Sequence, residues 1–135
     1  IPYSKGSKGH SDGVVLFHAI VDAILGALAL GDIGEHFPSE DNRWENANSK
    51  SFLEHTSNLM SDKGFSLGNL DATIILQQPQ LKNHIIEMRK NIASILHAEI
   101  DSISVKATTT DEMGFTGRGS GIAATAVVLI HSHGN

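Results

Sequence analysis

The chain has 135 residues, of which 40% are hydrophobic and 19% charged, a balance typical of one globular domain rather than of a disordered segment. Its formal net charge of −5 argues against a nucleic-acid backbone as partner, and the lack of cysteine excludes disulfides and thiolate metal sites. No apolar run approaches the ~20 residues that a membrane span requires. We therefore expect residues 1–135 to form a single domain.

The first third of the chain is predicted to be a loop followed by a buried helix. Residues 1–13 are rich in Gly, Ser and Lys and are predicted to form a strand end and a loop. Residues 14–30 show helical periodicity with apolar residues on most faces, which indicates a buried helix, and Ser11 or Asp12 is placed to cap it. His18 and Asp22 interrupt this apolar surface and, four residues apart, share one face.

The rest of the chain alternates between amphipathic helices and short apolar strands, after a turn-rich segment over residues 31–46 that is predicted to be a long surface loop. Helices are predicted over residues 49–63 and 83–97, and strands over residues 70–77, 103–107 and 121–130. With one further strand expected ahead of the first helix, this order predicts an α+β fold with a mixed four-stranded sheet and helices packed on one face.

Residues 10–13 (HSDG) precede the predicted buried helix. Backbone N–H groups at the start of a helix attract anions, and the hydroxyl of Ser11 and the imidazole of His10 add two donors. The alternative is an ordinary helix cap with an incidental histidine.

The pair His18 and Asp22 has two interpretations. A neutral imidazole is the commonest metal ligand, and a carboxylate often holds its second ring nitrogen. The alternative is a structural pair within the core that binds no metal. One histidine does not hold a zinc ion, since three protein ligands are the usual minimum for a catalytic site.

The C-terminal third contains two polar segments. Residues 106–110 (KATTT) leave a strand, where threonine hydroxyls could face a phosphate, although β-branched residues are common in strands anyway. The glycine-rich residues 114–121 precede a strand instead of opening a helix, so neither the dinucleotide nor the P-loop motif fits, while Arg118 could still bind an anion. His131 and His133 are expected in a mobile tail.

In this order and spacing, seven segments resemble the 2-C-methyl-D-erythritol 2,4-cyclodiphosphate synthase family over nearly the whole chain. The segments are residues 10–13 (HSDG), 18–19 (HA) with 22–23 (DA), 30–34 (LGDIG), 37–38 (FP), 68–74 (GNLDATI), 105–110 (VKATTT) and 114–119 (GFTGRG).

The resemblance implies a phosphorus-oxygen lyase of the non-mevalonate isoprenoid pathway, assembled as a homotrimer around its sheets with active sites between adjacent subunits. Its substrate would be 4-diphosphocytidyl-2-C-methyl-D-erythritol 2-phosphate, whose 2-phosphate attacks the β-phosphorus of the diphosphate with loss of CMP. We expect a location in the bacterial cytoplasm, or in the plastid stroma if the source is eukaryotic. The alternatives are a non-catalytic phospho-ligand-binding trimer and a purely structural trimer.

The resemblance also implies roles for individual residues. His10 and Thr109 would stabilise the transition state, and His18 would be a ligand of a divalent metal, usually zinc, with magnesium or manganese on the diphosphate. The erythritol phosphate would be held by His10 and Ser11, and the methylerythritol part by Asp32, Ile33, Gly34, Phe37, Pro38, Ser39, Glu40 and Asp41. The cytidine pocket, contributed to the site by the neighbouring subunit, would comprise Leu76, Gln77, Gln78, Pro79, Gln80, Leu81 and Lys82. The diphosphate would contact Thr108, Thr109, Thr110, Asp111, Phe115 and Arg118.

Four positions depart from the family pattern. The Asp-x-His pair that supplies two further zinc ligands in the family is missing from residues 1–13, so we expect either that the first strand is missing from the chain or that the protein does not bind the metal in the usual way. Val14 replaces an aspartate, Asp111 replaces a longer glutamate, and Gln80 stands where a basic residue is common.

Overall fold

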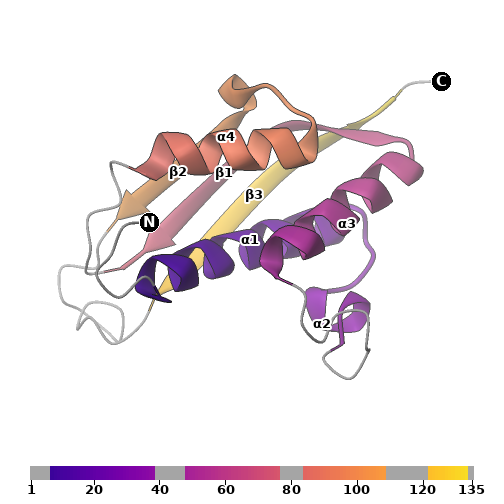
Figure 1. Ribbon diagram of the computed structural model, residues 1–135. Coiled ribbons are helices and arrows are strands. Elements are labelled where there is room, and N and C mark those ends of the chain that lie inside the picture. Colours follow the sequence, from indigo (N-terminus) through magenta and orange to yellow (C-terminus); the bar gives the residue numbers. More distant parts are fainter. Residues whose placement is uncertain (1–6, 39–47, 77–83, 109–121, 134–135) are drawn as a thin grey trace.

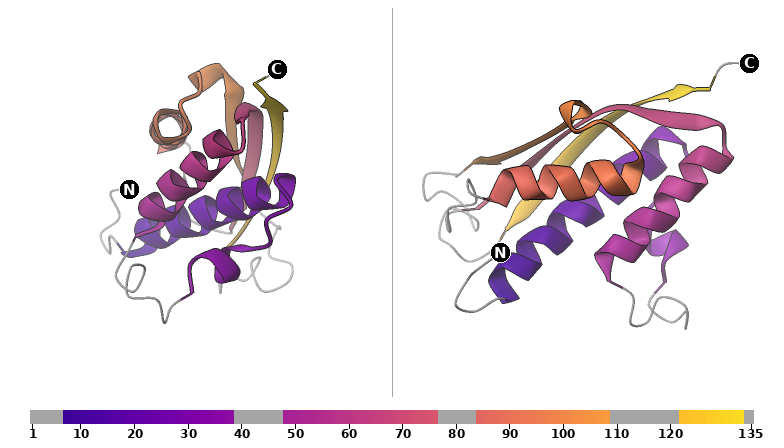
Figure 2. Two further views of the ribbon diagram at one scale, coloured as in Figure 1. Left: turned by 90° about the vertical axis from the view of Figure 1, so that its right-hand side faces the viewer. Right: turned by 45° about the horizontal axis from the view of Figure 1, so that its top comes forward.

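In the computed structural model, helices cover one face of a three-stranded mixed sheet (Figures 1 and 2). The structure describes residues 7–38, 48–76, 84–108 and 122–133, and the side chains of residues 7–12 are outside this description. The α+β class and the packing of helices on one face agree with the sequence prediction. The described residues form three strands rather than the four expected.

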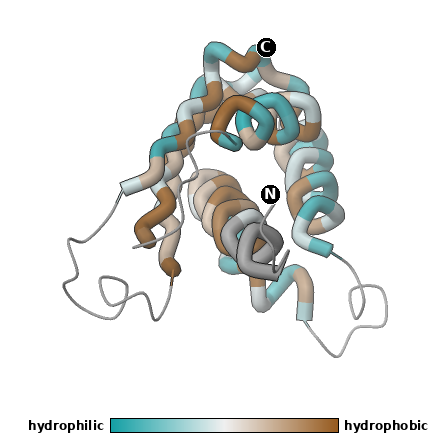
Figure 3. The backbone as a smooth tube through the Cα atoms, turned by 60° about the vertical axis from the view of Figure 1, so that its left-hand side comes forward, coloured by the Kyte–Doolittle hydropathy of each residue, from teal (hydrophilic) through white to brown (hydrophobic). Residues whose placement is uncertain are grey.

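The long helix α1 (Ser7–Ala27) belongs to the helical layer (Figure 1). Its side chains Leu16, Ile20, Val21, Ile24 and Leu25 are fully buried, which confirms the prediction of a buried helix. In Figure 3 hydrophobic residues recur along α1 and the strands, whereas α3 (Ser49–Asp62) and α4 (Ile85–Leu96) also carry many hydrophilic residues.

The prediction for residues 7–13 was wrong. These residues belong to the first two turns of α1, so Ser11 and Asp12 lie inside the helix and do not cap it. Gly and Ser are poor helix formers, but this intrinsic preference is weak and tertiary context overrides it. At the other end, Ala29 adopts a left-handed conformation (φ 58°) and the N–H of Leu30 donates to the carbonyl of Leu25 (2.9 Å), which ends the helix.

The described residues between 31 and 62, which exclude 39–47, form two helices, α2 (Ile33–His36) and α3 (Ser49–Asp62). The first lies inside the segment predicted to be a surface loop, and a helix of four residues is too short to produce a visible hydrophobic period. The second confirms the predicted helix to within one residue. It begins directly after Asn48, whose side chain caps the first turn by accepting a hydrogen bond from the N–H of Ser51 (2.9 Å).

Strand β1 (Phe65–Ile75) is the middle strand of the sheet and begins five residues before the predicted strand. The sequence pattern missed the start of this strand because a β-bulge interrupts the alternation of side chains. The register shifts between Leu67 and Asn69, so Gly68 is an extra residue opposite Leu129. A Cβ at Gly68 would lie 3.0 Å from the carbonyl oxygen of Leu129, a close approach that favours glycine.

The remaining elements are α4 (Ile85–Leu96), the short 3-10 helix η2 (Ile100–Ser102), β2 (Ile103–Thr108) and β3 (Ala123–Ser132). They confirm the predicted helix and the two predicted strands within a few residues. The middle strand pairs in parallel with β2 and antiparallel with β3. The expectation that His131 and His133 form a mobile tail was wrong, since His131 is part of β3 and the N–H of His133 donates to the carbonyl of Gly64 (2.7 Å).

The two faces of the sheet differ in what covers them. Towards the helices, Leu70, Ala72 and Ile74 of β1 are fully buried. On the other face, Val127 and Leu129 of β3 are 72% and 65% exposed. None of the helices in the described ranges is long and apolar enough to cross a membrane.

Candidate functional site

His18 lies in the middle of α1 and is partly buried against α3. Its ring is 5.8 Å from the ring of Phe52, centroid to centroid. Burial lowers the pKa of the His18 imidazole below its ordinary value, and the nearby Asp22 carboxylate opposes this shift. The neutral imidazole is therefore favoured at neutral pH, and the neutral form is the one that binds a metal ion.

Asp22, one helical turn further along α1, bonds to the backbone of the next helix. Its Oδ1 accepts a hydrogen bond from the N–H of Ile33 (2.8 Å). In the described part of the chain no hydrogen bond joins Asp22 to the His18 ring, so the carboxylate influences that ring through its charge. The sequence showed that the two side chains share a helix face, but it did not reveal the bond to Ile33.

Residues 31–34, here called the 31–34 turn, contain three of the residues expected to contact methylerythritol. Gly31 has a φ of +96°, and the Glu35 carboxylate lies only 2.5 Å from where a Cβ would be. Asp32 caps α2, because its Oδ1 accepts a hydrogen bond from the N–H of Glu35 (3.0 Å). The Nε2–H of His36 donates to the carbonyl of Leu30 (2.6 Å), which closes the turn from its other side.

Phe52 connects this turn to His18. It stacks on Phe37, with ring centroids 4.7 Å apart and planes inclined by 28°, while its other neighbour is the His18 ring. Phe37 is 7% exposed and also meets the edge of His55 at 5.4 Å. The structure thus brings together His18 and the segment from Asp32 to Phe37, with Pro38 directly after it. The sequence predicts a helix over residues 49–63 but does not reveal this contact of Phe52.

Leu76 and Thr108, expected at the cytidine and the diphosphate, lie side by side at the carboxyl ends of two parallel strands. The N–H of Leu76 donates to the carbonyl of Thr108 (3.0 Å). Leu76 is buried, whereas Thr108 is exposed. The amino-terminal part of α1 lies at the same end of the molecule (Figure 1). The short helix α2, by contrast, lies toward the other end of α1 (Figure 1), so the two groups of residues do not meet within one chain.

A polar cluster occupies the outer face of the sheet beside this strand end. Asp71 on β1 accepts hydrogen bonds from Lys106 Nζ and from Ser104 Oγ on β2, both at 2.9 Å. The bond from Lys106, followed by the one from Ser104, lowers the pKa of the Asp71 carboxyl. Lys106, part of the KATTT segment, is thus paired with a carboxylate of its own chain.

Many of the residues named from the resemblance are not described by the structure. The side chains of His10 and Ser11 belong to the undescribed start of α1. Also outside the described residues are Ser39, Glu40, Asp41, Gln77, Gln78, Pro79, Gln80, Leu81, Lys82, Thr109, Thr110, Asp111, Phe115 and Arg118.

His18 meets only part of what a metal site requires. The neutral, partly buried imidazole has the chemistry of a ligand. The residues described here contain no group of three His, Cys, Asp or Glu side chains that could hold a metal. Any further ligands must therefore come from outside these ranges, and the described site does not define a coordination geometry.

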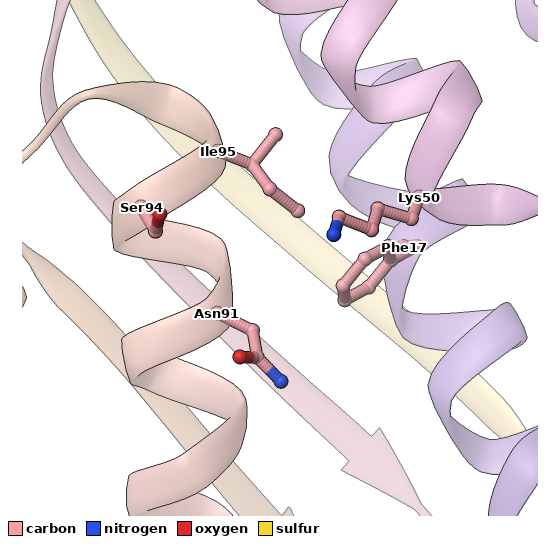
Figure 4. Close-up of a pocket in the computed structure, with 5 residues that line it drawn as sticks. All are labelled: Phe17, Lys50, Asn91, Ser94 and Ile95. Carbon is pink, nitrogen blue, oxygen red and sulfur yellow. The ribbon is translucent and has the colours of Figure 1, made fainter.

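A groove of about 300 Å³ lies elsewhere, on the helical side of the molecule (Figure 4). It is lined by Phe17, Lys50, Asn91, Ser94 and Ile95, with Lys50 reaching across from α3 toward α4. None of the residues expected at the site lines it.

Comparisons with known proteins agree on one family. The YgbB family model matches residues 1–131. A protein of Geobacter metallireducens named 2-C-methyl-D-erythritol 2,4-cyclodiphosphate synthase is 59% identical over 130 residues, which cover 96% of this chain and 83% of that protein. One of the same name from Alkaliphilus oremlandii is 57% identical with the same coverage.

Two solved structures have the same fold. The bifunctional IspDF of Campylobacter jejuni superposes with a TM-score of 0.83 at 42% identity, covering 87% of this chain and 32% of that one. The Plasmodium falciparum IspF CDP complex gives a TM-score of 0.79 at 33% identity, covering 89% of this chain and 72% of that one.

Proposed function

Because the chain belongs to the YgbB family, we infer that it forms 2-C-methyl-D-erythritol 2,4-cyclodiphosphate in the non-mevalonate isoprenoid pathway. The main support for this inference is the 59% identity, over 96% of the chain, to a protein named 2-C-methyl-D-erythritol 2,4-cyclodiphosphate synthase. The protein is a cyclising lyase that acts on a cytidine diphosphate substrate. This similarity does not favour the alternatives of a non-catalytic phospho-ligand binder and a structural trimer.

The reaction joins two phosphates of one molecule. An oxygen of the 2-phosphate forms a bond to the β-phosphorus of the diphosphate, the bond from that phosphorus to the bridging oxygen breaks, and CMP leaves with that oxygen. Little covalent chemistry is required of the protein, so its contribution is positioning and charge stabilisation.

We assign the described residues to the two ends of this substrate. The 31–34 turn would orient the methylerythritol hydroxyls, with the Asp32 carboxylate held in place by its cap bond to Glu35. Phe37 would form the apolar wall, supported by Phe52. Leu76 would begin the cytidine pocket and Thr108 the diphosphate contact, since a backbone hydrogen bond joins them at the strand ends.

The remaining assignments rest on the family motifs alone. On these motifs, His10 and Thr109 would stabilise the transition state, and His18 would bind zinc. Magnesium or manganese would accompany the diphosphate near Asp111. Such ions, when bound, would neutralise phosphate charge and orient the attacking oxygen.

The uncovered face of the sheet supports the proposal of a homotrimer with active sites between subunits. Val127 and Leu129 are large apolar side chains that are 72% and 65% exposed on neighbouring outward positions of one strand. Exposed apolar patches on soluble domains commonly mark protein interfaces. Three copies related by a threefold axis would bury these residues at the centre.

The activity is tested with the full-length protein, the cytidyl substrate, zinc and magnesium. Phosphorus NMR is expected to show the cyclic diphosphate appearing together with an equal amount of CMP. If substrate persists and no CMP is released under these conditions, the proposed function is wrong. Binding of the substrate without turnover would instead support the non-catalytic alternative.

A further inference from the structure

The carboxylate of Asp22 connects two parts of the proposed site. It belongs to α1, one helical turn after His18, and its Oδ1 accepts the hydrogen bond of the Ile33 N–H at 2.8 Å. Ile33 is the first residue of α2 and lies within the 31–34 turn. The Asp22 side chain therefore links the His18 helix directly to the turn expected to contact methylerythritol.

The Ile33 N–H is a donor that α2 itself does not satisfy. The first N–H groups of a helix have no partner within it, and the cap residue Asp32 satisfies a different one, that of Glu35. The other side-chain contact of this segment, from His36 to the Leu30 carbonyl, closes the turn on itself. Among the described hydrogen bonds, that of Asp22 is thus the one by which a side chain of α1 holds the turn.

The conformation of the turn makes such an anchor useful. Gly31 has φ +96°, a conformation that glycine adopts far more readily than other residues, and glycine places little restriction on the backbone of the turn. Asp32 follows it directly, and a hydrogen bond to a carboxylate is stronger than one to a neutral acceptor. Without the anchor, the Asp32 carboxylate would sample several positions relative to His18.

We propose that Asp22 is a positioning residue for the methylerythritol half of the substrate, acting through its hydrogen bond to Ile33. The proposal rests on the proposed function, because it assumes that the 31–34 turn contacts the methylerythritol. It predicts an effect confined to that half of the substrate. A carboxylate that acted mainly through the metal or through overall stability would affect the nucleotide half equally.

The test compares Asp22→Ala, Asp22→Asn and the native full-length protein. For Asp22→Ala we expect the KM for the cytidyl substrate to rise roughly five- to tenfold, the range for one lost hydrogen bond at an accessible site. The dissociation constant of CDP, which lacks methylerythritol, should stay within about twofold. Asp22→Asn should restore most of the KM, since its amide oxygen can still accept the Ile33 N–H. Glu99→Ala, which removes an exposed carboxylate that makes no cap hydrogen bond, is the matched control and should behave as native.

Three outcomes would overturn the proposal: an unchanged KM in Asp22→Ala, a parallel loss of CDP affinity, or an Asp22→Asn variant as impaired as Asp22→Ala. The last would show that charge rather than the hydrogen bond matters. Amide hydrogen exchange tests the anchor independently of turnover, since Ile33 should exchange faster in Asp22→Ala, and unchanged exchange would contradict the proposal. A failure of the proposed function is distinguishable, because then the native protein itself would release no CMP.

Discussion

Replacing both Val127 and Leu129 with serine tests whether subunits meet on the uncovered face of the sheet. Burying a Val or Leu side chain contributes about 2 kcal/mol. Scaled by exposures of 72% and 65%, the two residues would contribute about 3 kcal/mol per subunit and about 8 kcal/mol per trimer. This loss corresponds to a decrease of about six orders of magnitude in the association constant.

The assay is size-exclusion chromatography with light scattering at micromolar concentration, alongside circular dichroism and CMP release. We expect a native trimer and a folded monomeric double variant with little activity, because these side chains point away from the helical core. Ile86→Ser is the matched control, since Ile86 is 47% exposed on α4 and its replacement should leave the trimer intact. A double variant that stays trimeric at the same concentration would refute the reasoning.

Three further outcomes are expected. His18→Gln should lower bound zinc in metal analysis and slow CMP release by about 100-fold or more; undiminished zinc would contradict its role as ligand. In metal-free protein, burial lowers the His18 pKa in the folded state, so the free energy of unfolding should fall as the pH drops below the ordinary histidine value, and this fall should be smaller in His18→Gln. Gly31→Ala should cost about 1–3 kcal/mol in denaturant unfolding because of its positive φ and the nearby Glu35. Gly26→Ala, in a helix with open space, should be neutral or stabilising.

Most of the fold could be predicted because its elements carry strong apolar periodicity. Helices α3 and α4 and strands β2 and β3 lie within a few residues of where the sequence places them, and α1 overlaps the predicted helix over residues 14–27. The errors occur where local composition and tertiary context disagree. The first two turns of α1 contain weak helix formers, and the bulge at Gly68 interrupts the alternation of β1.

The site was predictable to a smaller extent and for a different reason. His18 and the segment from Asp32 to Phe37 were named from the family motifs, since spacing in the sequence does not show that they meet. Their connection runs through a backbone amide, that of Ile33, and through the ring of Phe52. A backbone amide has no sequence signature, and a phenylalanine at a helical core position looks the same whether or not a site lies beside it.

The bulge in β1 shows where this sheet can change its length. Leu67 and Leu70 are both buried although their positions differ by three, an odd number. The reason is that Gly68 has no partner of its own, while Leu67 and Asn69 pair with the consecutive residues Ile130 and Leu129. Loss of Gly68 would therefore leave a strand with uninterrupted alternation, in which all the remaining side chains stay on the same face of the sheet as before. Deletion of Asn69, the other residue opposite Leu129, would have the same effect, whereas deleting a residue elsewhere in the interior of β1 would turn part of the strand to the opposite face. Natural variants one residue shorter in this strand should thus lack one residue of this bulge.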